Sequence, residues 1–152
     1  MSNARMIDKL NDILRWEYAG LVQYLQHSFI VQDIWRDVFS GRFRSSAKEA
    51  LAHAEQIGDK IVAMGGVPTL ERAEVKQSAD LNEMLKFDLE LERTQARLYS
   101  EALEMVGDDT ALRVLLENIL LEEQEGVEEL EKILAQKNLA IGKSGGRATK
   151  AG

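Results

Sequence analysis

Apolar residues recur along this chain at helical spacing in four separate segments. In the first segment they fall three, four or seven positions apart from about residue 4 to about residue 35, which places them on one helix face. The same period returns over about residues 39–64, 80–106 and 109–137. Each segment therefore predicts an amphipathic helix with one buried face, and we expect an all-α protein.

The connection over residues 65–79 shapes the expected topology. It begins with Gly65-Gly66 and holds Pro68, the only proline, and it exceeds the roughly two to eight residues that usually join neighbouring helices of a bundle. A connection this long can run the length of the bundle, so the third helix should lie parallel to the second. Asp80 and Glu83 have the spacing of a capping box at its start. We therefore predict a four-helix bundle with one long crossover between the second and third helices.

Composition limits the chemistry and the compartment. The chain has no cysteine, which excludes disulfides, thiolate metal sites and thiol nucleophiles. The N-terminus is polar and helix-like, and no stretch approaches the roughly 18 apolar residues of a membrane span. We expect a cytoplasmic protein with no membrane partner.

Net charge separates the body of the chain from its end. The whole chain carries −7, and subtracting the +3 of the last ten residues leaves −10 on residues 1–142. An acidic body repels nucleic acid and attracts cations, although it also serves solubility. We expect one domain over residues 1–141, followed by a flexible, basic, glycine-rich tail over residues 142–152.

Four polar residues interrupt the apolar stripes, one on each predicted helix. They are Glu17, His53, Glu92 and Glu123. A lone charged carboxylate in a dry core costs several kcal/mol, and divalent metal or mutual hydrogen bonding can offset that cost. The four positions therefore form our candidate metal ligands, and no residue is assigned a catalytic role.

Two-metal carboxylate sites in such bundles take one Glu from each of two helices and a Glu-x-x-His motif from each of the others. In that pattern, Glu17 and Glu92 are the single carboxylates. His53 closes a motif whose first member is replaced by Ala50, and Glu123 opens one whose second member is replaced by Gly126. The constellation is thus two ligands short of a complete two-metal site.

Nearby glutamates and aromatic residues offer alternatives. Glu49 lies four positions before His53, and Glu122 and Glu125 lie three apart on the fourth helix, so each could replace a missing ligand or be an ordinary solvated side chain. Tyr24 is placed to hydrogen-bond a ligand carboxylate or to be a core residue. We interpret His27 as an interface or surface residue.

These motifs resemble the bacterioferritin branch of the ferritin-like superfamily over about residues 5–137. The segments that carry the resemblance are Leu10-Asn11, Glu17, Gln23-Tyr24-Leu25-Gln26-His27, His53-Ala54-Glu55, Gly65-Gly66-Val67-Pro68, Asp88-Leu89-Glu90-Leu91-Glu92 and Ile119-Leu120-Leu121-Glu122-Glu123. The resemblance implies a di-iron centre that oxidises Fe(II) and a shell of many subunits that stores iron. Haem in that family is held by a Met at the position of Leu51, so no haem is expected here.

Three functions follow as hypotheses. The first, which we favour, is iron binding or storage with an incomplete di-iron site, in which iron is present at reduced occupancy or absent and any activity is ferroxidase-type oxidation of Fe(II). The second is a silent scaffold or partner subunit without metal, for example in a mixed shell beside an active paralogue. The third is a DNA-protecting miniferritin, which the acidic body disfavours. Trp35, Phe39 and Phe43 predict at least a homodimer along the outer faces of the first two helices.

Overall fold

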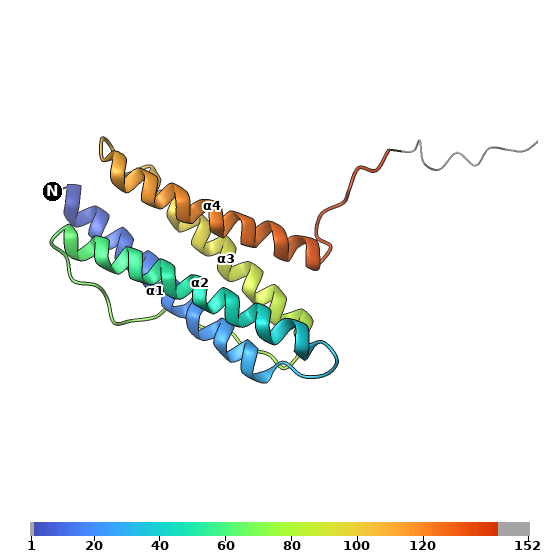
Figure 1. Ribbon diagram of the computed structural model, residues 1–152. Coiled ribbons are helices and arrows are strands. Elements are labelled where there is room, and N and C mark those ends of the chain that lie inside the picture. Colours follow the sequence, from blue (N-terminus) through green and yellow to red (C-terminus); the bar gives the residue numbers. More distant parts are fainter. Residues whose placement is uncertain (1, 143–152) are drawn as a thin grey trace, which may run out of the picture.

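The computed structural model describes residues 2–142, which form four helices and, within that range, no strand. The helices are α1 (Ser2–Ile30), α2 (Arg36–Ala63), α3 (Leu81–Leu103) and α4 (Thr110–Ile133). They pack as a four-helix bundle with one long crossover between α2 and α3 (Figure 1). The predicted fold class is therefore confirmed.

The crossover decides the direction of α3. A short turn joins α1 to α2, and the chain after α2 then runs back along the bundle, so that α3 begins beside the α1–α2 turn (Figure 1). A cavity at this end is lined by Asp33 from the turn and by Asp80 from the start of α3. Consequently α3 runs parallel to α2, as the length of the connection predicted.

Hydrogen bonds fix the crossover on α1. The backbone N–H of Ala73 donates to the carbonyl of Arg15 at 3.0 Å, and the N–H of Lys76 donates to Oε1 of Gln23 at 3.0 Å. The Ala73 side chain is buried in the core. The crossover is thus a packed part of the bundle, and its polar backbone groups have partners in α1.

Side-chain caps mark two helix starts. The carboxylate of Asp80 accepts from the N–H of Glu83 at 3.0 Å, and that of Asp109 accepts from the N–H of Leu112 at 3.0 Å. Gly65, with φ of 88°, follows the end of α2. α1 and α4 each end about four or five residues before the predicted positions, and α2 begins at Arg36 rather than near residue 39.

The apolar core is divided into two clusters, and each contains residues from all four helices. One cluster contains Met6, Leu10, Ile57, Tyr99 and Leu116 among others, and the second contains Tyr24, Phe43, Met84, Leu89 and Val127 among others. Between them lies a belt of buried polar side chains, which includes Glu17, His53, Gln95 and Glu123. The four candidate ligands lie in this belt.

The aromatic residues near the α1–α2 turn require a correction. Phe43 is only 1% exposed, its ring lies 5.5 Å from the ring of His27, and Phe39 packs 5.9 Å from Phe43. Of the three aromatics expected at a contact between chains, Phe43 belongs to the core and Trp35, at 52% exposed, remains at the surface.

Two further expectations concern the C-terminal tail and a membrane-spanning helix. Most of the predicted tail, residues 143–152, lies outside the described residues. Within residues 2–142, no helix has the length and apolarity needed to cross a membrane.

Candidate metal centre

Each helix contributes one of the four predicted ligands to the polar belt, and all four are buried. Glu17 projects from α1, His53 from α2, Glu92 from α3 and Glu123 from α4. Helical periodicity explains this convergence, because each residue occupies an inward position of an otherwise apolar stripe. The structure brings three of them into ligand distance and directs the fourth elsewhere.

His53 lies at the centre of the belt. Its Nδ1 is 2.9 Å from Oε1 of Glu123 and 3.5 Å from Oε1 of Glu17. Its Nε2 is 2.5 Å from Oε2 of Glu122, the neighbour of Glu123 on α4. Both ring nitrogens therefore face carboxylates. Nδ1 faces Glu123 and Glu17 inside the core, and Nε2 faces Glu122 at its edge.

Glu17 is only half satisfied. Its Oε1 accepts a hydrogen bond of 2.8 Å from the hydroxyl of Tyr99, whereas its Oε2 is buried and has no hydrogen-bond partner among the residues that the structure describes. A buried carboxylate oxygen without a partner is costly. An atom of this kind, beside an imidazole and a second carboxylate, is suited to a cation.

The ligand atoms of Glu17, His53 and Glu123 all lie within 4.8 Å of one another. We call these residues the buried triplet. Two carboxylate oxygens and one imidazole nitrogen form a donor set that divalent transition metals accept. The triplet has the composition and spacing to hold one such cation.

Glu92 does not join the triplet. Its carboxyl group accepts a hydrogen bond from the hydroxyl of Tyr24, and it fills the space beside Gly126. A Cβ built at position 126 would overlap with Oε2 of Glu92. The place where a histidine of the second motif would stand is thus occupied by a carboxyl group from α3.

The other missing ligand leaves no polar group behind. Ala50 is buried on α2, and its Cβ would lie 3.6 Å from a Cβ at Gly20 of α1. The small side chains let the two helices approach closely. Leu51, at the position of the family's haem ligand, is 44% exposed on the outside of the bundle.

Burial changes the proton affinity of the belt. Desolvation raises the pKa of Glu92 from 4.5 to about 8, although its hydrogen bond from Tyr24 opposes the shift. Desolvation and the charge of Glu17 likewise raise the pKa of Glu123 well above its ordinary value. Burial lowers the pKa of His53, but its bonds to Glu123 and Glu17 outweigh that effect and raise it to about 11. Without metal, the belt holds protons at neutral pH.

A second group of ligand atoms lies at the edge of the belt. Glu49, His53 and Glu122 offer one ligand atom each, and these atoms also lie within 4.8 Å of one another. A groove between α2 and α4 is lined by Glu49, Glu122 and Glu125. Partial desolvation raises the pKa of the Glu49 carboxyl, and the charge of Glu122 adds to the rise while His53 opposes it.

The sequence did not predict the roles of Tyr99 and His27. Tyr99, whose hydroxyl donates to Glu17, was not among the predicted site residues, although its position seven residues after Glu92 was an available signal. His27 was interpreted as a surface or interface residue, and this was wrong. It is fully buried, with Nδ1 3.0 Å from Oδ1 of Asp88, which also accepts a 2.9 Å bond from Gln23.

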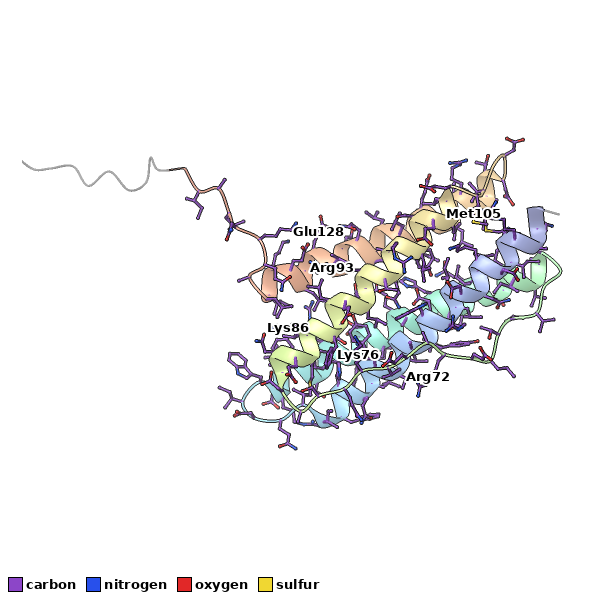
Figure 2. All side chains as sticks on the ribbon, turned by 180° about the vertical axis from the view of Figure 1, so that it is seen from behind. Arg72, Lys76, Lys86, Arg93, Met105 and Glu128 are labelled. Carbon is purple, nitrogen blue, oxygen red and sulfur yellow. The ribbon has the colours of Figure 1, made fainter. Side chains whose placement is uncertain are left out.

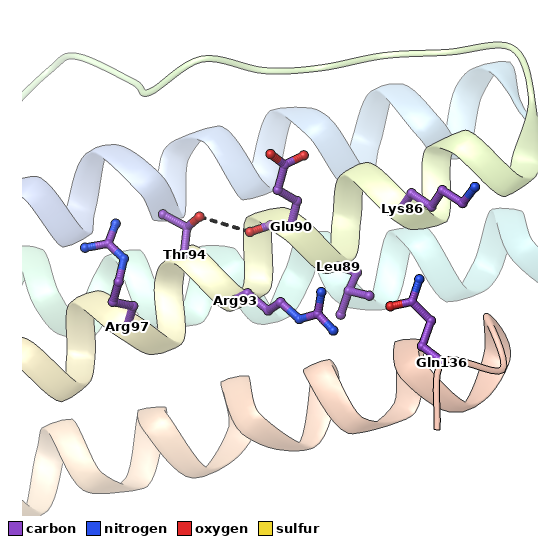
Figure 3. A pocket seen from close by; sticks show the side chains of 7 residues that line it. All are labelled: Lys86, Leu89, Glu90, Arg93, Thr94, Arg97 and Gln136. Atoms are coloured by element: carbon purple, nitrogen blue, oxygen red, sulfur yellow. Dashed lines mark hydrogen bonds between the residues drawn. The ribbon is translucent and has the colours of Figure 1, made fainter. Parts of the chain in front are cut away.

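A groove on the outer side of α3 lies apart from these groups. It carries Lys86, Arg93 and Arg97 along α3 and Gln136 from beyond the end of α4 (Figure 3). Arg93 is paired with Glu131 at 3.0 Å and Arg97 with Glu101 at 2.7 Å. On this side of the bundle, basic side chains such as Lys76 and Lys86 stand along the crossover and α3 (Figure 2). The groove contributes nothing to the belt.

Comparisons with known proteins agree with this arrangement. A family model described as Ferritin-like domain matches residues 7–140. Bacterioferritin BfrA of Mycobacterium tuberculosis (strain ATCC 25618 / H37Rv) is 30% identical over 126 residues, which cover 80% of this chain and 79% of that protein. Bacterial ferritin of Neisseria meningitidis serogroup B is 31% identical over 90 residues, so the match spans 59% of this chain and only 58% of that relative.

A solved structure shows the same architecture. The crystal structure of ferritin-like, diiron-carboxylate proteins from Bacillus anthracis str. Ames superposes with a TM-score of 0.86 at 30% identity, covering 88% of this chain and 98% of that chain. These matches confirm the resemblance that the motifs indicated. The chain belongs to the ferritin-like family.

Proposed function

We propose that this protein binds iron at the buried triplet, as an iron-binding or iron-storage protein with an incomplete di-iron site. The observation that carries the proposal is the unpartnered Oε2 of Glu17, which lies in a cluster with ligand atoms of His53 and Glu123. Tyr99 orients Glu17 through the other oxygen. Bound iron supplies Lewis-acid and redox chemistry, and the chain supplies two carboxylates and one imidazole.

The residues present fit one cation and do not fit a second iron of the usual kind. Ala50 has no donor atom, and Gly126 has neither a donor nor free space because the Glu92 carboxyl lies against it. Glu92 is itself bonded to Tyr24. A site with one imidazole and no bridging carboxylate should oxidise Fe(II) slowly or not at all.

The proposal has consequences for cofactors, assembly and compartment. Leu51 offers no donor atom, so haem is not part of it. The exposed apolar side chains on the outer faces of α1 and α2 favour an assembly of at least two copies, with a mixed shell beside an active paralogue as the alternative. We place the protein in the cytoplasm, because a chain without cysteine fits a reducing compartment.

A metal-free scaffold subunit is the second candidate. In its favour, Tyr24 bonds Glu92 and His53 bonds Glu123, so the belt satisfies most of its own polar groups. The raised pKa values of Glu92 and Glu123 reduce the charge that a metal would otherwise have to neutralise. Such a belt can exist without a cation.

Metal content of the purified protein separates the two candidates. After anaerobic addition of Fe(II) and removal of excess, we expect one firmly held iron that depends on the triplet. The double variant Glu17→Gln, Glu123→Gln should lose it, whereas Glu101→Gln on the surface should retain it. Iron absent from the unmodified protein would favour the scaffold, and two irons per chain with rapid oxidation by oxygen would show that the site is functionally complete.

A further inference from the structure

The second group of ligand atoms, at the edge of the belt, forms a site of its own. We infer that Glu49, Glu122 and Nε2 of His53 bind a divalent cation at the mouth of the groove between α2 and α4. We call this cluster the outer site. It shares His53 with the buried triplet but uses the opposite ring nitrogen and two different carboxylates. Neither carboxylate belongs to the two-metal pattern described above.

The environment of His53 is the first argument. A metal-bound histidine usually donates its other N–H to a carboxylate or carbonyl, which fixes the ring and its tautomer. Here Nδ1 is 2.9 Å from Glu123 and 3.5 Å from Glu17, and the ring is buried. The buried carboxylates therefore act as the positioning groups for a cation on Nε2. In this mode Nδ1 keeps its proton, so the outer site is filled when the triplet holds no metal, and the two sites are alternative uses of one neutral imidazole.

The position of the two carboxylates is the second argument. Oε2 of Glu122 lies 2.5 Å from Nε2, where a proton holds the two atoms together in the absence of metal. A cation displaces such a proton on binding. Within residues 2–142, the only cationic partner found for Glu122 is His53, and no lysine or arginine forms an ion pair with Glu49. A cation at Nε2 would take over the positive charge that this proton otherwise provides between Glu49 and Glu122.

Access to solvent is the third argument. The groove has a volume of about 360 Å³, and Glu122 at its edge has a side chain that is 52% exposed. A small cavity of about 10 Å³ lies deeper and is lined by Glu49, Glu122 and His53 together with Glu17. The unpartnered Oε2 belongs to this same Glu17. Glu49 and Glu122 line both the groove and this cavity, so a cation that exchanges its water for these carboxylates can reach Nε2 without crossing the apolar core.

The inference rests on the proposed function only for the class of cation. Two carboxylates and one imidazole suit Zn²⁺ as well as Fe²⁺, and Zn²⁺ has no redox chemistry to complicate binding. Zinc ions alone are therefore the probe, and the full chain is used throughout.

Calorimetric titration with Zn²⁺ compares two charge-matched double variants. Glu49→Gln with Glu122→Gln removes both outer ligands, and Glu125→Gln with Glu129→Gln removes two carboxylates that line the same groove outside the cluster. We expect the first variant to weaken zinc binding more than about tenfold, the lower range for losing even an indirect partner of a metal, and the control to stay within about threefold. An equal loss in both would overturn the inference, because it would indicate diffuse attraction by an acidic groove.

Anomalous diffraction from zinc-soaked crystals locates the ion directly. A peak beside Nε2, between Glu49 and Glu122, is the expected result. A peak only beside Nδ1, between Glu17 and Glu123, would overturn the outer site and leave the buried triplet standing. Crystals with no zinc at either nitrogen would overturn both.

Discussion

The carboxyl group of Glu92 occupies the space into which a side chain at position 126 would project. Gly126 therefore has a structural role in the middle of α4, where glycine would normally cost about 1 kcal/mol relative to alanine. It makes room for a group from α3 that is also bonded to Tyr24. Any side chain added at position 126, a second imidazole included, must therefore displace the Glu92 carboxyl.

This contact predicts the sign of a single substitution. Gly126→Ala gains about 1 kcal/mol of helix propensity, but it displaces the Glu92 carboxyl and breaks its bond with Tyr24, which costs about 1–3 kcal/mol. We expect the free energy of unfolding to stay level or to fall by up to about 2 kcal/mol. In a Glu92→Ala background the same substitution should be stabilising. Urea unfolding of the four proteins of this cycle measures the difference, and equal effects in both backgrounds would disprove the contact.

The raised proton affinities predict how metal-free stability depends on pH. Glu92 titrates near 4.5 when unfolded and at about 8 when folded, so the folded state binds more protons between these values. His53, raised from 6.5 to about 11, acts in the same direction over its own range. The unfolding free energy should therefore be highest near pH 5 and fall as pH rises toward 8, by at most about 1.4 kcal/mol per pH unit for each group.

Chemical denaturation at pH 5, 6.5 and 8 in the presence of a chelator measures this slope. Glu92→Gln removes one of the contributing groups and should make the slope shallower, whereas Glu90→Gln, on the solvent side of α3, should leave it unchanged. A stability that rises between pH 5 and pH 8 in the unmodified protein would contradict the protonated belt.

Restoring the missing ligands should restore oxidation. The double variant Ala50→Glu, Gly126→His supplies both donors, and the histidine forces Glu92 away from Tyr24 toward the interior of the belt. We expect oxygen-dependent Fe(II) oxidation in this variant and slow or no oxidation in the unmodified chain. The rise in absorbance of the ferric product measures the rate. Ala50→Glu alone is the control, since it leaves Gly126 and the position of Glu92 unchanged. Equal rates of Fe(II) oxidation in all three proteins would contradict the proposal that the missing ligands make the site incomplete.

Exposed apolar residues predict where copies of the chain meet. Val22 and Phe29 lie seven residues apart on α1, and Leu51 and Val62 lie eleven apart on α2, spacings that return each pair to one side of its helix. We expect light scattering to show at least a dimer at micromolar concentration. Phe29→Glu with Leu51→Lys should shift it toward monomer, and Leu139→Lys beyond α4 should not. A monomeric unmodified protein would refute the assembly.

The buried pair of His27 and Asp88 predicts a large stability effect away from the ligands. Asp88→Ala leaves the side chains of His27 and Gln23 without their acceptor, which should cost about 2–5 kcal/mol. Glu90→Ala, two residues later in an exposed pair with Lys76, should change stability by less than about 1 kcal/mol. Similar losses in the two variants would show that the buried network adds little.

The sequence was sufficient for the number, order and direction of the helices, because apolar period and connection length are local signals. It did not predict the helix boundaries at which no glycine or capping residue stands. The turn after α1 uses Asp33 at φ of 76°, and α4 is followed by Ala135 at φ of 53°, both left-handed conformations in residues other than glycine. α2 begins after Trp35, whose side chain makes no capping bond, so its first turn could not be recognised.

For the candidate site, the sequence predicted which residues point inward but not how they pair. Inward spacing located Glu17, His53, Glu92 and Glu123 in one layer of the bundle. Spacing along one helix could not show which carboxylates face one another across helices. The pairing of Glu92 with Tyr24, rather than with the triplet, depends on distances between α1, α3 and α4. The partners of His53 on both sides of its ring depend on tertiary packing in the same way.

The division of the apolar core into two clusters also bears on how this protein tolerates change. Each cluster draws residues from all four helices, so each end of the bundle holds every helix in place without help from the layer between them. Substitutions in the polar layer consequently alter chemistry at little risk to the architecture. A change of ligand in this layer therefore leaves in place the two apolar clusters that present the layer.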